Sequence, residues 1–233
     1  MKAVGFKEFG DPEVLEVMDI PEVFAGPGEI RIRNYASAVN PTDIVSRSGL
    51  ISQFRKDFPL PSVPGMDISG IVDQVGEGVE TGINIGDKVM GMVIPNELHG
   101  AYREQIILNQ FAVVKNPEGY SFVESSTLPM NGLTARLSLD LLNLNKEQVL
   151  AVTGGPGAYG GYVIQLAKAD GLTVIADANE NDIELLNELG VDHIIPRGKN
   201  FVEKIKEVFP EGVDGIADGA LLNEKAIDAV KDN

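Results

Sequence analysis

The sequence predicts an α/β protein in which a β-rich domain precedes a doubly wound parallel sheet, and three observations predict it. Val149–Gly171 reads as a buried strand, a glycine turn and a helix in unbroken succession. Residues 1–115 carry short strand patterns separated by turn-forming residues. From Ser121 onward helix patterns alternate with apolar strands, which produces a parallel sheet with right-handed crossovers. We therefore expect domains at residues 1–117 and 118–233.

The first domain is expected to be a compact β-barrel. Glu29–Arg33 alternates polar and apolar residues, which is typical of a strand with one solvated face. Glycine turns at residues 26–28 and 76–78 stand where strand patterns stop. The expected strands are Lys2–Phe6, Leu15–Ile20, Glu29–Val39, Ile68–Val75, Lys88–Val93 and Arg103–Leu108.

In the second domain, Ser121 and Glu124 form a capping box, and Pro129 is expected to end the helix that they start. The elements expected next are helix Leu133–Leu142, strand Leu150–Val152, strand Leu172–Ala178, helix Ile183–Leu189, strand Asp192–Ile195, helix Phe201–Phe209 and strand Val213–Ala217. This makes four strands, whereas such folds usually have about six. The sequence therefore predicts that the C-terminal part of the fold is absent from this chain.

A glycine turn links the first strand and helix of this domain. Gly154, Gly157 and Gly160 are spaced three apart, and small residues there let backbone N–H groups approach a pyrophosphate at the helix N-terminus. The spacing alone is a weak signal, because glycine turns are common at such junctions. Asp177 ends the next strand, roughly 20 residues further on, where an acid can accept a hydrogen bond from a ribose hydroxyl. The alternative is that Asp177 caps the helix that follows.

Composition excludes several function classes. A net charge of −16 argues against nucleic-acid partners, since phosphate contacts need clustered Lys and Arg. No apolar run approaches the ~18 residues of a membrane span, and the N-terminus lacks the apolar core of a signal peptide, which predicts a cytoplasmic protein. The absence of cysteine excludes disulfides, thiolate nucleophiles and Cys-ligated zinc.

Ordered motifs run along almost the whole chain. They are Val39–Asp43 with Arg47 and Gly49, Pro64–Asp67 with Gly70, Gly76–Val79, Gly86-Asp87, Gly100–Tyr102, Leu133–Ala135, the glycine turn, Ile164–Lys168 and Leu189–His193. With these motifs the chain resembles the zinc-independent medium-chain dehydrogenases/reductases of the quinone oxidoreductase, or zeta-crystallin, group. The resemblance implies a GroES-like barrel followed by a Rossmann domain. It also implies a C-terminal segment, absent here, that returns to the first domain, and a homodimer of the full-length protein.

The resemblance also bears on metal binding. In zinc-dependent relatives a Cys stands near Thr42, and Gly-His-Glu stands where this chain has Gly65-Met66-Asp67. A hydroxyl and a thioether do not replace thiolate and imidazole as zinc ligands. We therefore expect no metal site.

Without a metal, the resemblance implies hydride transfer from NAD(P)H to an electron-poor acceptor, a quinone or an α,β-unsaturated carbonyl. Asn40 and Thr134 would lie near the nicotinamide, with Asp43 and Arg47 on the substrate side, so the expected catalytic residues are Asn40, Asp43 and Arg47. The alternative is that Asn40 and Asp43 only start and cap a short helix at Pro41–Arg47. The expected cofactor-binding residues are Asn40, Thr134, Gly154, Gly157, Ala158, Tyr159, Gly160, Asp177 and Ala178.

The glycine turn departs from the usual form of the family. Pro156 lies inside it, and Ala158-Tyr159 stands where Gly-Val is common. The Tyr159 ring either covers or crowds the cofactor, or simply packs against the neighbouring helix. A non-catalytic, zeta-crystallin-like structural or sensing module that keeps the nucleotide fold is the alternative to an enzyme.

The end of the second strand favours NADH over NADPH, against the habit of the group. Residues 176–182 hold three acids and no base. The Asp177 carboxylate can accept from both ribose hydroxyls of NADH but repels the 2′-phosphate of NADPH.

Overall fold

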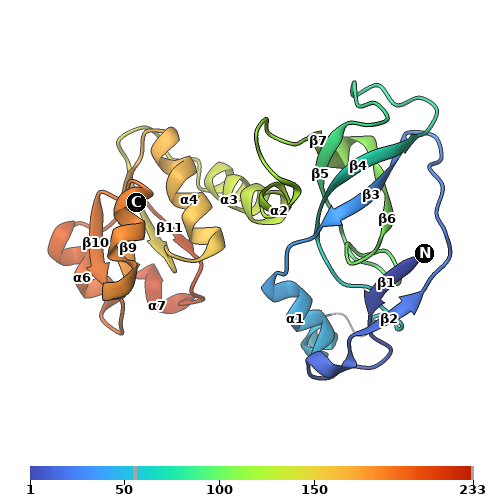
Figure 1. Cartoon of the computed structure of the whole chain (residues 1–233). Coiled ribbons are helices and arrows are strands. Elements are labelled where there is room, and N and C mark those ends of the chain that lie inside the picture. Colours follow the sequence, from blue (N-terminus) through green and yellow to red (C-terminus); the bar gives the residue numbers. More distant parts are fainter. Residues whose placement is uncertain (55–56, 232–233) are drawn as a thin grey trace. The chain divides into compact units, whose positions relative to one another are not determined.

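The computed structural model describes residues 1–54 and 57–231 and divides the chain into two compact units, Met1–Met130 and Asn131–Asn233 (Figure 1). The elements of the first unit are β1 (Lys2–Gly5), β2 (Glu16–Asp19), β3 (Glu29–Ala36), α1 (Pro41–Arg47), β4 (Asp67–Val75), β5 (Lys88–Met92), β6 (Gln105–Asn109), β7 (Val113–Lys115) and α2 (Phe122–Ser125). Those that follow are α3 (Pro129–Leu142), β8 (Val149–Thr153), α4 (Ala158–Ala169), β9 (Thr173–Ala178), α5 (Ile183–Glu188), β10 (His193–Pro196), α6 (Phe201–Val208), β11 (Gly215–Asp218) and α7 (Glu224–Ile227). Short 3-10 helices lie at Pro12–Val14, Leu50–Gln53, Gln110–Ala112 and Glu180–Asp182.

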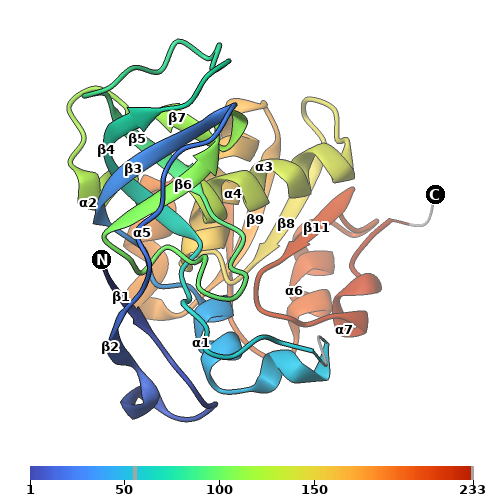
Figure 2. The ribbon, with the colours of Figure 1, turned by 90° about the vertical axis from the view of Figure 1, so that its right-hand side faces the viewer.

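The first unit is built on an antiparallel sheet in the order β6-β3-β4-β5-β7, with β1 and β2 paired separately. Ile30 and Ile32 of β3 are fully buried, whereas the residues between and after them are partly or fully exposed, as the alternating pattern predicts. Figure 2 shows the β1–β2 ribbon beside this sheet, to which an Ala3–Arg103 bridge connects it. The predicted barrel is confirmed.

Several boundaries in this part differ from the sequence-based expectation, and β7 was not predicted. Two of the differences have a clear physical cause. Strand β3 ends at Ala36 and not at Val39, because the hydroxyl of Ser37 donates to the carbonyl of Ala101 and the chain leaves the ladder. Pro129 does not end a helix but begins α3, where a missing N–H costs nothing.

Residues 118–130 pack with the first unit. The ring of Phe122 stacks on Tyr35 at 4.8 Å between centroids, and the Met130 N–H donates to Asp67. By its contacts, the first unit therefore ends at Met130. The domain boundary expected after residue 117 stays a prediction.

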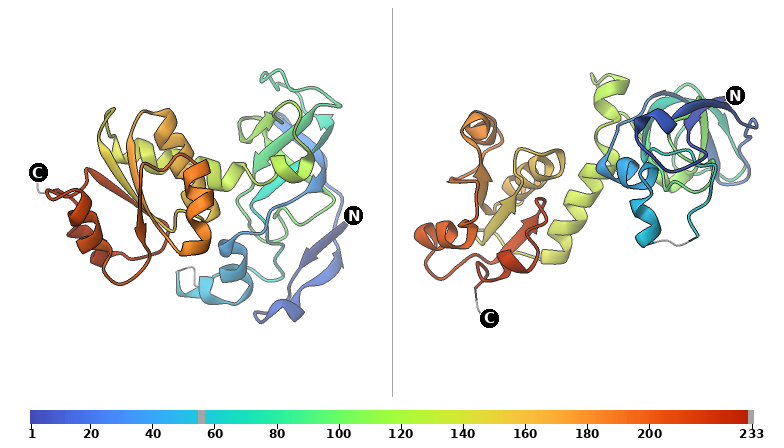
Figure 3. Two further views of the ribbon diagram at one scale, coloured as in Figure 1. Left: turned by 60° about the vertical axis from the view of Figure 1, so that its left-hand side comes forward. Right: turned by 90° about the horizontal axis from the view of Figure 1, so that it is seen from below.

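The second unit contains the parallel sheet that the sequence predicts, in the order β10-β9-β8-β11. Helices α3, α4 and α5 lie on one face of the sheet, and α6 and α7 lie on the other (Figure 3). Their apolar side chains form the two buried clusters on these faces. Strand β11 starts at Gly215 and not at Val213, because Val213 forms an isolated bridge with Val230 instead. β9 and β10 lie on one side of β8, and β11 lies on the other, so the strand order reverses direction at β8. Ligands bind at the carboxyl ends of the strands at such a switch point.

Candidate functional site

In the first unit, the site is organised by the N-terminus of α1. Asn40 is the N-cap residue, and the carboxylate of Asp43 accepts its backbone N–H at 2.8 Å. The other oxygen of Asp43 accepts the N–H of Gly65 at 2.8 Å, and the hydroxyl of Tyr102 donates to this carboxylate at 3.1 Å. Asp43 is thus the helix-capping residue of the alternative reading, and it ties α1 to two other segments.

The side chain of Asn40 is held by a second carboxylate. Its amide nitrogen donates to Asp67 at 2.6 Å, and Asp67 also accepts the Met130 N–H at 2.6 Å. Asp67 is fully buried, and burial raises its pKa, an effect that its hydrogen bonds oppose and the nearby Asp43 charge reinforces. The pKa of the Tyr102 hydroxyl is also raised, first by burial and then by Asp43. Asn40 therefore sits on a buried network that fixes its orientation.

A cavity of about 240 Å³ lies beside this network. Its lining is mostly apolar and consists of Thr42, Asp43, Val45, Ser46, Ile51, Phe58, Met66 and Pro95. The Thr42 hydroxyl lies 3.1 Å from the Met66 sulfur. A thioether is a weak acceptor, so this hydroxyl is able to donate to a stronger acceptor that enters the cavity.

Arg47 lies elsewhere on α1 and is not among the residues that line this cavity. Its guanidinium donates to the carbonyl of Gly10, and the Gly10 N–H donates back to the Arg47 carbonyl at 3.0 Å. Arg47 is nine-tenths buried in this contact. The geometry supports a structural role at the N-terminal segment.

In the second unit, the glycine turn stands at the carboxyl end of β8. Gly154 has φ of +65°, and the N–H of Gly157, the N-cap of α4, donates to its carbonyl at 2.9 Å. A Cβ at Gly160 would lie 2.4 Å from that same carbonyl oxygen. The turn therefore needs glycine at both ends, and it places the N-terminus of a twelve-residue helix at the switch point.

Asp177, at the end of β9, is held from two sides. Its carboxylate accepts the Gly154 N–H at 2.8 Å and the Arg197 Nε at 2.9 Å. Asp177 is not a helix cap, because Asn179 is the N-cap of the 3-10 helix that follows. The structure thus brings Asp177 to the glycine turn, as the sequence predicts, and adds a base that it did not predict.

The remaining predicted cofactor residues lie close to the turn or on α3. Ala158 is the first residue of α4, and Ala178 is the buried last residue of β9. The Tyr159 hydroxyl lies 2.9 Å from that of Ser138 on α3, which in turn donates to the Thr134 carbonyl. Tyr159 therefore packs against the neighbouring helix, as one of the two expectations has it.

The carboxyl ends of β8 and β11 are tied together. Asp218 accepts the Thr153 hydroxyl at 2.5 Å and the Asn223 N–H at 2.7 Å. Burial alone would raise the pKa of Asp218, but these hydrogen bonds lower it below its ordinary value. These hydrogen bonds thus hold the carboxyl ends of β8 and β11 together at the switch point.

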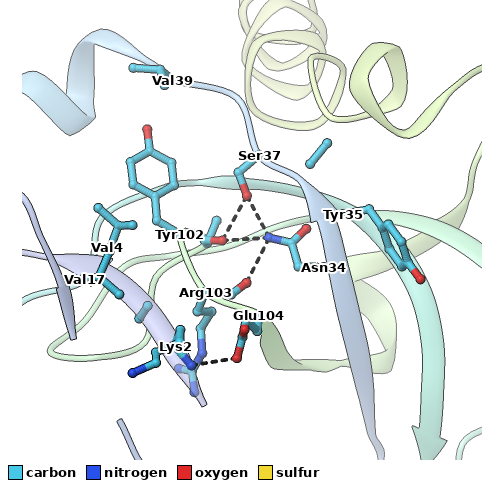
Figure 4. Close-up of a pocket in the computed structure, with 13 residues that line it drawn as sticks. Lys2, Val4, Val17, Asn34, Tyr35, Ser37, Val39, Tyr102, Arg103 and Glu104 are labelled. Carbon is cyan, nitrogen blue, oxygen red and sulfur yellow. Dashed lines mark hydrogen bonds between the residues drawn. The ribbon is translucent and has the colours of Figure 1, made fainter. Parts of the chain in front are cut away.

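A larger cavity, about 540 Å³, lies in the first unit, and none of the predicted site residues lines it, although its wall includes Tyr102, which donates to Asp43 (Figure 4). The Asn34 amide nitrogen on its wall donates to the Ser37 hydroxyl and to the carbonyls of Ala101 and Arg103. These bonds hold the end of β3 against the segment before β6.

Metal-ligating side chains do not gather in the described residues. Among residues 1–54 and 57–231, no group of three or more His, Cys, Asp or Glu side chains could hold an ion. Over the same residues, no helix has the length and apolarity needed to cross a membrane.

Comparison with known proteins decides the family. Residues 26–118 match the alcohol dehydrogenase GroES-like domain, and residues 158–231 match the domain called zinc-binding dehydrogenase. The quinone oxidoreductase structure from Coxiella burnetii is 32% identical, with a TM-score of 0.83 over 99% of this chain and 73% of its own. The chain belongs to the quinone oxidoreductase group of the medium-chain dehydrogenases/reductases. It therefore has the GroES-like barrel and Rossmann-type sheet of that family.

Two curated relatives match along the whole chain. The tomato (Solanum lycopersicum) 2-methylene-furan-3-one reductase is 31% identical, and the Arabidopsis thaliana NADPH-dependent alkenal/one oxidoreductase, chloroplastic, is 29% identical. In both cases the match covers 100% of this chain but 60% of the relative. The chain thus spans about three fifths of the length of these oxidoreductases.

Sequence reasoning missed the partners that hold the predicted residues. Asp67 and Tyr102 appear in the family motifs but were given no role, although both touch Asn40 or Asp43. Arg197 was not predicted because it lies outside residues 176–182, after the next strand in the sequence. The one available signal is that Arg197 follows the strand that pairs with β9.

Proposed function

We propose that the protein transfers a hydride from NAD(P)H to a quinone or an α,β-unsaturated carbonyl without a metal ion. The observation that carries the proposal is the glycine turn at the carboxyl end of β8, closed by the hydrogen bond between Gly154 and Asp177. The names of the Coxiella and tomato relatives, a quinone oxidoreductase and a furanone reductase, support the acceptor class.

The residues of the second unit fit a dinucleotide. Gly157 is the N-cap of α4, and it has no side chain that could block a pyrophosphate at the helix N-terminus. Gly160 lets the first turn of the helix pack closely against the backbone of Gly154. Asp177 lies where the adenosine ribose is expected, at the end of the neighbouring strand. Thr134, Ala158, Tyr159 and Ala178 complete the proposed cofactor residues of the second unit, and Asn40 is the proposed cofactor residue of the first unit.

The cavity beside α1 suits a small planar acceptor. Its volume of about 240 Å³ and its apolar lining match a quinone ring or a short enone. When bound, the nicotinamide supplies the hydride. The Thr42 hydroxyl donates to the substrate oxygen, where negative charge develops, while Asp67 keeps the Asn40 side chain in one orientation.

Thr42 and Met66 support a metal-free reaction. They stand where the resemblance places zinc ligands in other relatives, and here they contact each other. Neither a hydroxyl nor a thioether is a zinc ligand of the usual kind. Asp43 caps α1 and shapes the cavity wall, and Arg47 anchors α1 to the N-terminal segment.

The choice between NADH and NADPH remains a prediction. The NADH preference rested on Asp177 and on the lack of a base in residues 176–182, and the structure adds a base from outside this stretch, because Arg197 pairs with Asp177. The homodimer and the cytoplasmic location stay predictions as well.

The test is oxidation of NADH and NADPH by chelator-treated protein with 1,4-benzoquinone and with a short enone, followed spectrophotometrically. We expect turnover with at least one acceptor. Thr42→Val should lower kcat/KM by about tenfold or more while leaving cofactor affinity unchanged, because it removes one donor at the reacting oxygen. No turnover with any pair, or turnover only after zinc is added, contradicts the proposal.

A further inference from the structure

We infer that Arg197 is a specificity-determining residue that binds the 2′-phosphate of NADPH, so that the acidic end of β9 accepts this cofactor. The inference rests on the proposed function, because it presupposes a dinucleotide at the glycine turn. It adds a residue that neither the fold nor the sequence pattern of the second strand indicates.

Strand pairing places Arg197 at the right edge of the sheet. β10 runs parallel to β9 with Pro196 opposite Ala178, and the Arg197 N–H donates to the Ala178 carbonyl at 2.8 Å. The backbone of Arg197 is therefore fixed one residue past the carboxyl end of β9. The Asp177 carboxylate lies within reach of its side chain, and Nε donates to it at 2.9 Å.

The exposure of the two partners shows which charge faces a ligand. The Asp177 side chain is 7% exposed, whereas the Arg197 side chain is 37% exposed. The carboxylate therefore lies beneath the guanidinium. Among the described residues, the Arg197 guanidinium is shown in contact with Asp177 through Nε. Arginine carries four further N–H donors on its two terminal nitrogens.

This arrangement changes the electrostatics of the ribose site. An unpaired Asp177 would repel a phosphate of charge near −2, but here the carboxylate is neutralised by a cation that lies closer to solvent. A guanidinium held at Nε can present its terminal N–H groups to two oxygens of one phosphate. Asp177 then acts as a positioning residue that aims Arg197, and it no longer excludes NADPH.

Two further acids and one base flank this position. Glu180 and Asp182 lie in the 3-10 helix after β9, and Lys199 lies two residues past Arg197. Glu180 and Lys199 are exposed, and Asp182 is partly exposed. Removing the charge of Lys199 changes the net charge of the same loop by the same amount, but its side chain has no contact with Asp177 among the described contacts. Lys199→Gln is therefore a matched control for Arg197→Gln.

The test is calorimetric binding of two cofactor fragments, 2′,5′-ADP and 5′-ADP, to the wild-type protein, Arg197→Gln and Lys199→Gln. Thermal unfolding first establishes that the variants are folded. Arg197→Gln should weaken 2′,5′-ADP by about tenfold or more and change 5′-ADP by less than about twofold, because only the first fragment carries the 2′-phosphate. Lys199→Gln should change both by less than about twofold. Equal effects of Arg197→Gln on both fragments, or none, overturn the inference.

A double variant separates a phosphate contact from simple neutralisation. If Arg197 only cancels the Asp177 charge, Asp177→Asn combined with Arg197→Gln restores wild-type affinity for 2′,5′-ADP, and the inference fails. If Arg197 holds the phosphate, the double variant remains weakened. Failure of the wild-type protein to bind either fragment overturns the proposed cofactor use as well. Binding of both fragments without discrimination by Arg197 overturns only this inference.

Discussion

Asp67 in the first unit and Asp218 in the second are both carboxylates at the base of a candidate site, yet their pKa values move in opposite directions. Asp67 accepts one side-chain N–H and one backbone N–H, is fully buried and lies near Asp43. Asp218 accepts a hydroxyl and the Asn223 N–H and is only partly buried, and the backbone N–H groups of Leu222 and Ala220 also lower its pKa. The pKa of Asp67 is raised by burial, whereas hydrogen bonds outweigh burial at Asp218 and lower its pKa.

The difference teaches that the number of hydrogen-bond donors has to be weighed against burial to explain the direction in which the pKa of a carboxylate moves. Deep burial and a nearby like charge raise the pKa of a carboxylate, whereas hydrogen-bond donors lower it, and the larger of these effects sets the direction. In the first unit the carboxylates hold Asn40 and α1 together by hydrogen bonds from neutral groups. In the second unit Asp177 is instead paired with a cation, the Arg197 guanidinium.

The largest expected effect comes from removing the most heavily bonded carboxylate of the first unit. Asp43→Ala leaves the N–H groups of Asn40 and Gly65 without their side-chain acceptor. The Tyr102 hydroxyl keeps only its longer contact, 3.3 Å, with the Ala38 carbonyl. Each unsatisfied buried donor costs about 1 to 3 kcal/mol, so we expect the free energy of unfolding to fall by about 3 kcal/mol or more. Chemical denaturation measures it.

Asp11→Ala is the matched control, because the Asp11 side chain is exposed and makes no capping hydrogen bond. It should change the free energy of unfolding by less than about 0.5 kcal/mol. If Asp43→Ala were equally mild, the network around Asn40 would not be the feature that stabilises α1.

A smaller effect is expected for Asp218→Asn in the second unit. The variant keeps an acceptor for Thr153 but turns an amide N–H₂ toward the N–H of Asn223, which should cost about 1 to 2 kcal/mol near pH 7. Because the folded pKa lies below the ordinary value of 3.8, the stabilisation by Asp218 is present above pH 3.8 and is lost as the pH falls through the folded pKa. Denaturation curves at several pH values should show the two proteins converging in acid. A gap that stays constant down to strongly acidic pH argues against this assignment.

The smallest expected effect is a difference in pH dependence, because the stabilities of the Asp67 and Asp218 variants should change with pH in opposite directions. The folded pKa of Asp67 is raised, so its contribution is fully present below pH 3.8 and is lost as the pH rises through the folded pKa. Asp67→Asn has no such titration. The stability of the variant relative to the wild type should therefore increase as the pH rises above 3.8, which is the opposite slope to that expected for Asp218→Asn. Parallel slopes for the two variants would break the comparison.

Local signals predict much of the fold. Helix α1 runs from Pro41 to Arg47 as expected, since the N-cap, the capping carboxylate and the proline all lie within four residues. The four parallel strands were predicted from short apolar runs that both faces of the sheet bury. Boundaries set by contacts distant in sequence were missed, such as the end of β3 at Ala36, where Ser37 bonds to Ala101.

The candidate site divides in the same way. Asp177 was predicted to accept from the ribose of a dinucleotide held at the glycine turn, and the structure joins it to this turn by a hydrogen bond from Gly154. Asp67 and Arg197 could not be assigned from spacing, because each reaches its partner through a strand pairing or a loop that no short motif encodes. For Arg47 the family motif predicted a place on the substrate side, whereas in the structure its guanidinium donates to the Gly10 carbonyl.

The central claim, metal-free hydride transfer to an electron-poor acceptor, is tested most directly by following the transferred atom. Chelator-treated protein is mixed with an enone and with NADPH or NADH that carries deuterium at the transferable C4 position, and the reduced product is analysed by mass spectrometry and NMR. The account predicts one deuterium at the β-carbon of the product, with no added metal. Product without deuterium, or deuterium transfer that appears only when zinc is supplied, would contradict it.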